Sequence, residues 1–77
     1  MKINWPAKDL EQPYDLCTQI NGVYADVIQS VTGWYCLWDG QLRSKEFLTR
    51  AEAIEWFDCN IDDLKRGKIP QDTEMTG

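Results

Sequence analysis

The sequence predicts an α+β fold, in which an antiparallel β-meander of three to four strands packs on one C-terminal α-helix. Three dipeptides, Asn21-Gly22, Thr32-Gly33 and Asp39-Gly40, separate segments rich in β-branched and aromatic residues. Such dipeptides favour the backbone conformations of two-residue hairpin loops. A helix-capping pattern follows the last of these segments. At 77 residues the chain is long enough for one domain with one small core.

Four strands are expected from the positions of the turns. They cover residues 14–20, 23–31, 34–38 and 41–47. Two-residue loops fix the register of an antiparallel pair. Trp38 should therefore lie opposite Gln41 on one side and opposite Val27 on the other, and Val27 should lie opposite Leu16.

One helix is expected after the fourth strand. Thr49 is a favourable N-cap, and Glu52, three positions later, completes a capping box. Gly67 is expected to end the helix. An alternative places a break near Cys59, with a second short helix starting at Asn60. The apolar side at helical spacing comprises Ala53, Ile54, Phe57, Ile61 and Leu64.

The chain divides into a lead-in segment, a folded domain and a flexible polar tail. These parts cover residues 1–13, 14–66 and 67–77. Pro6 and Pro13 bracket a stretch that fits one helical turn or a loop. Trp5 or Leu10 is expected to pack at the edge of the domain. The tail offers few side chains to bury.

Side chains of a strand alternate between the two faces of its sheet, so the register assigns each residue to a face. The more apolar face should lie under the helix, with Trp34 and Trp38 among its members. Arg43 and Lys45 are expected at the edge of that same face.

The second face is expected to be open to solvent, unless the lead-in or the tail covers it. No Lys or Arg is expected on it, and an exposed apolar patch of this kind is typical of a contact surface. We therefore predict a partner-binding face made of Tyr24, Asp26, Ile28, Tyr35, Leu37, Leu42 and Glu46.

The charge pattern favours a basic partner. The net charge is −5, with 13 acidic and 8 basic residues. An acidic protein attracts basic surfaces and lacks the cationic footprint of a nucleic-acid binder, although the same charge also serves solubility. The predicted acidic helix face consists of Glu52, Glu55, Asp58 and Asp62.

Catalytic, metal and cofactor sites are not expected. The chain has no His, and Cys17, Cys36 and Cys59 are widely spaced without a Cys-x-x-Cys motif. Free, buried thiols in a reducing cytoplasm are expected. Asp26 beside Cys17 should raise the pKa of that thiol, which disfavours a nucleophile. No segment is apolar enough for a membrane span.

A hairpin that leads into a capped helix carries a recognisable set of residues, namely Trp38, Asp39, Gly40, Ser44, Phe47, Thr49, Glu52 and Ala53. On these positions, residues 23–57 resemble the arm-site, AP2-like DNA-binding domain of phage-type tyrosine integrases. The resemblance implies a three-stranded sheet with one helix, whose open face contacts DNA through cationic side chains. In the predicted register that face instead carries Asp26 and Glu46. DNA binding would need a one-residue slip that exposes Trp34 and Trp38 beside Arg43 and Lys45.

In size, charge and hairpin-helix build, the chain is also similar to small acidic phage proteins that block host defence, such as anti-CRISPR inhibitors. That similarity implies an inhibitor of a host complex that handles nucleic acid. We therefore expect a non-enzymatic protein-binding module of phage or mobile-element origin, with a host protein of basic surface or a second copy as its partner. The alternative is an AP2-like nucleic-acid-binding module.

Overall fold

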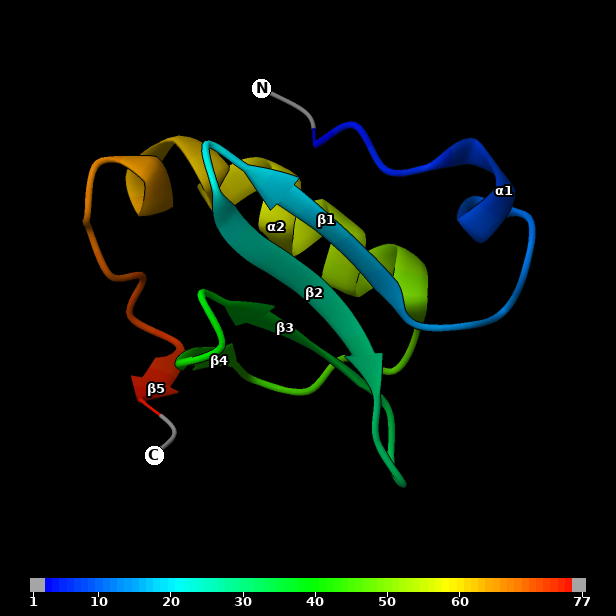
Figure 1. The fold of residues 1–77 in the computed structure, drawn as a ribbon. Helices are drawn as coiled ribbons and strands as arrows, with labels where there is room; N and C mark the ends of the chain where they lie inside the picture. The colour runs from blue at the N-terminus through cyan, green and yellow to red at the C-terminus, as the bar shows by residue number, and fades with distance from the viewer. Residues whose placement is uncertain (1–2, 76–77) are drawn as a thin grey trace.

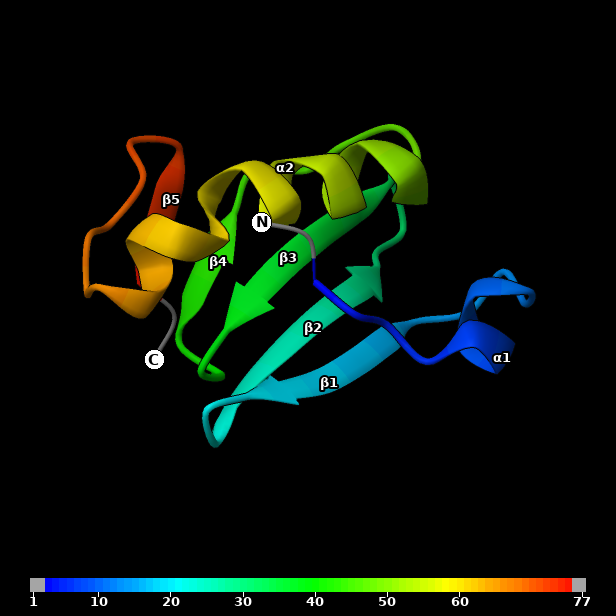
Figure 2. The same cartoon turned by 90° about the horizontal axis from the view of Figure 1, so that it is seen from above.

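The computed structural model describes residues 3–75 and shows one antiparallel sheet with a long helix across one face (Figures 1 and 2). The sheet order is β1-β2-β3-β4-β5, so each strand pairs with its neighbours in the sequence. The predicted α+β class and the meander are confirmed. The elements are α1 (Ala7–Leu10), β1 (Leu16–Ile20), β2 (Val23–Gln29), β3 (Trp34–Trp38), β4 (Leu42–Ser44), α2 (Arg50–Lys65) and β5 (Thr73–Met75).

The fifth strand lies in the segment that was expected to be a polar tail. β5 pairs with β4, with Leu42 opposite Met75 and Ser44 opposite Thr73. The sheet therefore has five strands where the sequence predicts three or four. Strand pairing needs only backbone donors and acceptors, so a three-residue strand with Met75 as its one apolar residue leaves no apolar alternation to detect.

The first hairpin has the predicted loop. Asn21 and Gly22 have φ angles of 52° and 81°, and Ile20 lies opposite Val23. Both loop residues therefore adopt the left-handed conformation that a tight hairpin loop of this kind requires.

The second hairpin turns one residue earlier than predicted. The amide of Ser30 donates to the carbonyl of Gly33 at 2.7 Å, which centres the turn on residues 31 and 32. Val27 consequently lies opposite Cys36 rather than Trp38. Moving the turn by one residue changes the pairing partner of each β2 residue by two positions. A change of two positions leaves every side chain of β2 and β3 on its predicted face.

The third hairpin contains an extra residue that corrects the predicted register. Trp38 lies opposite Leu42 instead of Gln41, although the amide of Gln41 still donates to the Trp38 carbonyl at 3.1 Å. Gln41 is therefore a bulge residue, and a one-residue shift exchanges the two faces of β4. Leu42, which is only 7% exposed, belongs to the core, whereas Arg43 lies on the open side of the sheet.

The core lies between α2 and the sheet. Phe57 is fully buried, and its ring centroid lies 5.9 Å from Trp5, 6.3 Å from Trp38 and 5.8 Å from Trp56. The predicted core-facing residues of the helix are confirmed, with Ile54 half-buried at the margin. Other buried residues are Leu16, Ala25, Val27, Cys36, Ala53, Ile61 and Leu64.

α2 has the predicted cap and runs without a break. The Thr49 hydroxyl oxygen accepts a hydrogen bond from the Glu52 amide at 3.2 Å. The helix continues through Cys59 to Lys65, so the alternative with a second short helix is wrong. Gly67 follows with φ of 83°, which suits a glycine just after a helix end.

The lead-in packs on the helix side of the sheet. Trp5 is 6% exposed and Leu10 is exposed, and the amide of Ile3 donates to the Asp58 carboxylate at 2.8 Å. Figure 2 shows this segment beside α2 and β1. Residues 3–13 therefore leave the opposite face of the sheet uncovered.

Arg50 holds the lead-in to the start of α2. Its two terminal guanidinium nitrogens donate to four backbone carbonyls that sequence reasoning did not connect with it. A planar guanidinium suits this role because it carries several fixed donors. The acceptors are the carbonyl oxygens of Asp9, Leu10, Gln12 and Tyr14.

Replacing Arg50 with alanine is expected to loosen α1 without unfolding the sheet. Loss of these hydrogen bonds should lower the local stability of the lead-in by about 1.4 kcal/mol, or about tenfold in its opening. Tryptic cleavage after Lys8 measures that opening, with Arg50→Lys intermediate. The exposed Arg66, changed to alanine, is the control. Equal cleavage rates in the two alanine variants would contradict the assigned role.

Candidate functional site

The side of the sheet opposite α2 is the candidate site, and we refer to it as the open face. Figure 1 looks onto it, with α2 behind the strands. Strand pairing and side-chain alternation place residues from all five strands on it. The members of the open face are Cys17, Gln19, Tyr24, Asp26, Ile28, Tyr35, Leu37, Arg43 and Glu74.

The apolar part of the open face lies on β2 and β3. Ile28 lies directly opposite Tyr35, and Leu37 follows two residues later on the same face. Tyr24 is 54% exposed, whereas the other three are half-buried. The predicted grouping of these four side chains on one face is therefore observed, and neighbours at this spacing form a continuous patch.

A single row of side chains crosses the open face from edge to edge. Asp26 lies opposite Leu37, and Leu37 lies opposite Arg43. Cys17 on β1 and Glu74 on β5 continue the row at its two ends. Leu37 thus has an acidic neighbour on one side and a cationic neighbour on the other.

Arg43 is the main correction to the predicted site. Its guanidinium carbon lies 3.9 Å from the centroid of the Tyr35 ring, a cation–π contact. Its Nη2 lies 3.7 Å from Oε1 of Glu46. The open face therefore carries a cation, contrary to the prediction, because the bulge at Gln41 reverses β4.

Glu46 lies at the rim of the open face and braces the second hairpin. Its carboxylate accepts hydrogen bonds from the hydroxyls of Ser30 and Thr32 at 2.5 and 2.6 Å. These bonds, with a smaller contribution from Arg43, hold the pKa of Glu46 below its ordinary value. Glu46 thus stabilises the 30–33 loop through contacts within the chain.

Two of the cysteines, Cys17 and Cys36, have thiol pKa values above the ordinary value. A hydrogen bond with Asp26, aided by burial, raises the pKa of Cys17 to about 11, as expected. Burial raises the pKa of Cys36 to about 12, and its Sγ donates to the Ala53 carbonyl. All three cysteines of residues 3–75 are free. In this range no three His, Cys, Asp or Glu residues gather to hold a metal.

The outer side of α2 is acidic. Glu52, Glu55 and Asp62 are exposed, whereas Asp58 is half-buried and accepts the hydrogen bond from Ile3. Of the predicted acidic helix face, three carboxylates are therefore presented outward and the fourth secures the lead-in.

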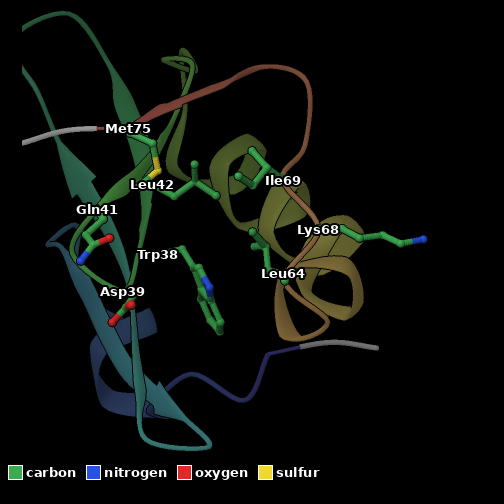
Figure 3. Close-up of a pocket in the computed structure, with 9 residues that line it drawn as sticks. Trp38, Asp39, Gln41, Leu42, Leu64, Lys68, Ile69 and Met75 are labelled. Carbon is green, nitrogen blue, oxygen red and sulfur yellow. The ribbon is translucent and has the colours of Figure 1, made fainter.

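A small apolar cleft lies between the end of α2 and the last strands (Figure 3). Its volume is about 150 Å³, and sequence reasoning missed it because β5 forms one wall. The Lys68 side chain points away from it in Figure 3. The apolar lining consists of Trp38, Leu42, Leu64, Ile69 and Met75.

The aromatic residues of the nucleic-acid alternative do not reach the open face. Trp34 and Trp38 are half-buried against the core under α2. Lys45 is exposed, with its Nζ 5.5 Å from the Phe47 ring centroid. The bulge therefore brings Arg43 to the open face, while both tryptophans stay beneath the helix.

Neither helix within residues 3–75 has the length and apolar character needed to cross a lipid bilayer. Comparisons with protein-family models, curated proteins and solved structures found no match to this chain. The function is therefore inferred from the open face and from the charge of α2.

Proposed function

We propose that this chain is a non-enzymatic module that binds a protein through the open face. The observation that carries the proposal is the continuous patch of Tyr24, Ile28, Tyr35 and Leu37 on the uncovered side of β2 and β3. Tyrosines and aliphatic residues on a rigid sheet give a large contact area at a small cost in conformational entropy. The Arg43–Tyr35 stack adds a charged residue of the type enriched at binding hot spots.

The charge of the molecule directs the proposal toward a basic partner complex. Three exposed carboxylates on α2 and a net charge of −5 would steer the module to a positive surface. A host complex that handles nucleic acid has such a surface, so we place the module as an inhibitor of one. Phage or mobile-element origin, suggested by the resemblances, remains part of this proposal.

Nucleic-acid binding is the alternative, and the open face argues against it. Arg43 is accompanied there by Asp26 and Glu74, and binding to phosphates requires an excess of cations. We expect no retention on heparin at low salt. Retention that Arg43→Glu abolishes would favour the alternative.

Replacing Tyr35 with aspartate is expected to abolish capture of the partner from a lysate of the native host. A buried carboxylate at the centre of the face should weaken binding at least about thirtyfold. Leu48→Asp is the matched control, because Leu48 is 83% exposed and lies in the segment between β4 and α2, outside the strands. Circular dichroism confirms that both variants fold. Equal capture by both variants would contradict a docking role for the open face.

A further inference from the structure

The charges of the open face are arranged so that the face complements itself. We propose that two copies of this chain pack open face to open face about a two-fold axis parallel to β3. The inference rests on the proposed function, because it names a second copy as the partner of the same face.

The strand register supplies the geometry. Asp26 on β2 and Arg43 on β4 flank Leu37 on β3 in one row, and neighbouring strands are about 4.8 Å apart. The Cα atoms of Asp26 and Arg43 are therefore nearly equidistant from that of the central leucine, and the Arg43 guanidinium itself stacks over Tyr35, the next residue of β3 on the same face. A two-fold rotation about an axis along β3 places β2 of one copy over β4 of the other. Positions along the strands do not change, so the row of one copy lies over the row of the other.

That rotation gives every side chain of the row a compatible neighbour in the second copy. Leu37 meets Leu37 of the second copy, and Arg43 meets Asp26 of the second copy at two symmetric positions. At the ends of the row, Glu74 faces Cys17 of the second copy, whose thiol is neutral at pH 7. The five-residue row thus contains two opposite-charge pairs and no like-charge pair.

The other in-plane axis is excluded by the same charges. A two-fold axis perpendicular to the strands would lay each strand over its own copy. Asp26 would then face Asp26, and Arg43 would face Arg43. Like charges in contact across an interface are costly. The charges of the row therefore favour the two-fold axis along β3.

Apolar packing supports the same arrangement. Tyr35, on the same strand as Leu37, also lies near the axis, and Ile28 on β2 extends the contact. Two sheets facing each other at about 10 Å leave room for interlocking side chains of this size. The two α2 helices then lie on the outside of the dimer, where their acidic sides remain available to a basic partner.

Arg43 and Asp26 both retain bonding capacity for the second copy. The guanidinium stacks on Tyr35 and meets Glu46 through one nitrogen, and it has further donors. The Asp26 carboxylate shares one hydrogen bond with Cys17, and a carboxylate can accept several more. A guanidinium–carboxylate pair across a desolvated interface is well suited to fixing orientation.

A charge-exchange experiment in analytical ultracentrifugation tests the inference. The unmodified chain is expected to dimerise. Arg43→Asp and Asp26→Arg should each weaken dimerisation at least about thirtyfold, because each creates two like-charge pairs. An equimolar mixture of these two variants should form a heterodimer, since both pairs become complementary again. The double variant, carrying both changes, should dimerise like the unmodified chain.

Several results would overturn the inference. These are a monomer at all concentrations, single variants that dimerise normally, or folded single variants that do not associate on mixing. Leu37→Asp provides a second route if one single variant fails to fold, because it places two carboxylates on the axis. A monomer whose capture of a host protein still depends on Tyr35 would overturn the dimer alone. A monomer in which Tyr35→Asp leaves capture unchanged would overturn the proposed function as well.

Discussion

Replacing Phe57 with alanine is expected to remove about half of the stability of this protein. Phe57 is fully buried and its ring meets three tryptophans, from the lead-in, from β3 and from α2. Truncating a buried phenylalanine costs about 3–5 kcal/mol, whereas a domain of this size has about 4–12 kcal/mol in total. Urea unfolding followed by tryptophan fluorescence measures the loss.

Two control variants distinguish the loss of packing around Phe57 from the general effect of a substitution. Phe57→Leu keeps much of the buried volume and should cost about 1.5 kcal/mol. Leu48→Ala changes an exposed side chain and should stay within about 0.5 kcal/mol of the unmodified protein. If Phe57→Ala cost no more than Phe57→Leu, the three-tryptophan contact would not be central to the core.

Replacing Gly33 with alanine is expected to give the second largest loss. An added Cβ would lie 2.2 Å from the carbonyl oxygen of Phe47. That oxygen accepts the hydrogen bond from Trp34, at 2.8 Å, that joins the start of β3 to the segment before α2. Backbone must move to relieve the overlap, and the bond is weakened. We expect a loss of about 3 kcal/mol in the free energy of unfolding.

Gly22→Ala is the matched comparison for Gly33→Ala. Gly22 has φ of 81° but open space where a Cβ would lie. Its substitution should therefore cost only the strain of a left-handed residue, about 1 kcal/mol. Thermal unfolding of both variants measures the difference, which should be at least about 8 °C in Tm. Similar Tm values would show that the β3 end can rearrange around a methyl group.

The structure changes how the open face is understood in one respect. The face was expected to be acidic and free of cations, with a host protein of basic surface or a second copy as its partner. Arg43 instead lies in line with Asp26 on either side of Leu37. A face with balanced charges and an apolar centre complements a second copy of itself. The net acidity is then carried by the outer side of α2.

Local signals in the sequence determined most of the fold. The Asn21-Gly22 loop, the alternation along β1, β2 and β3, and the Thr49 cap of α2 depend on residues close together in the chain. These signals also placed Tyr24, Ile28, Tyr35 and Leu37 on one face. An even shift in the second hairpin left that placement unchanged.

Only the tertiary structure decided the features that depend on distant partners. The bulge at Gln41 lets Leu42 enter the core and turns Arg43 outward, and β5 pairs with β4 from a segment whose sequence predicts a polar tail. Arg50 likewise finds its four carbonyls in residues 9–14. The free energy of these arrangements comes from contacts between segments far apart in the chain. A pattern over a few neighbouring residues therefore does not predict these arrangements.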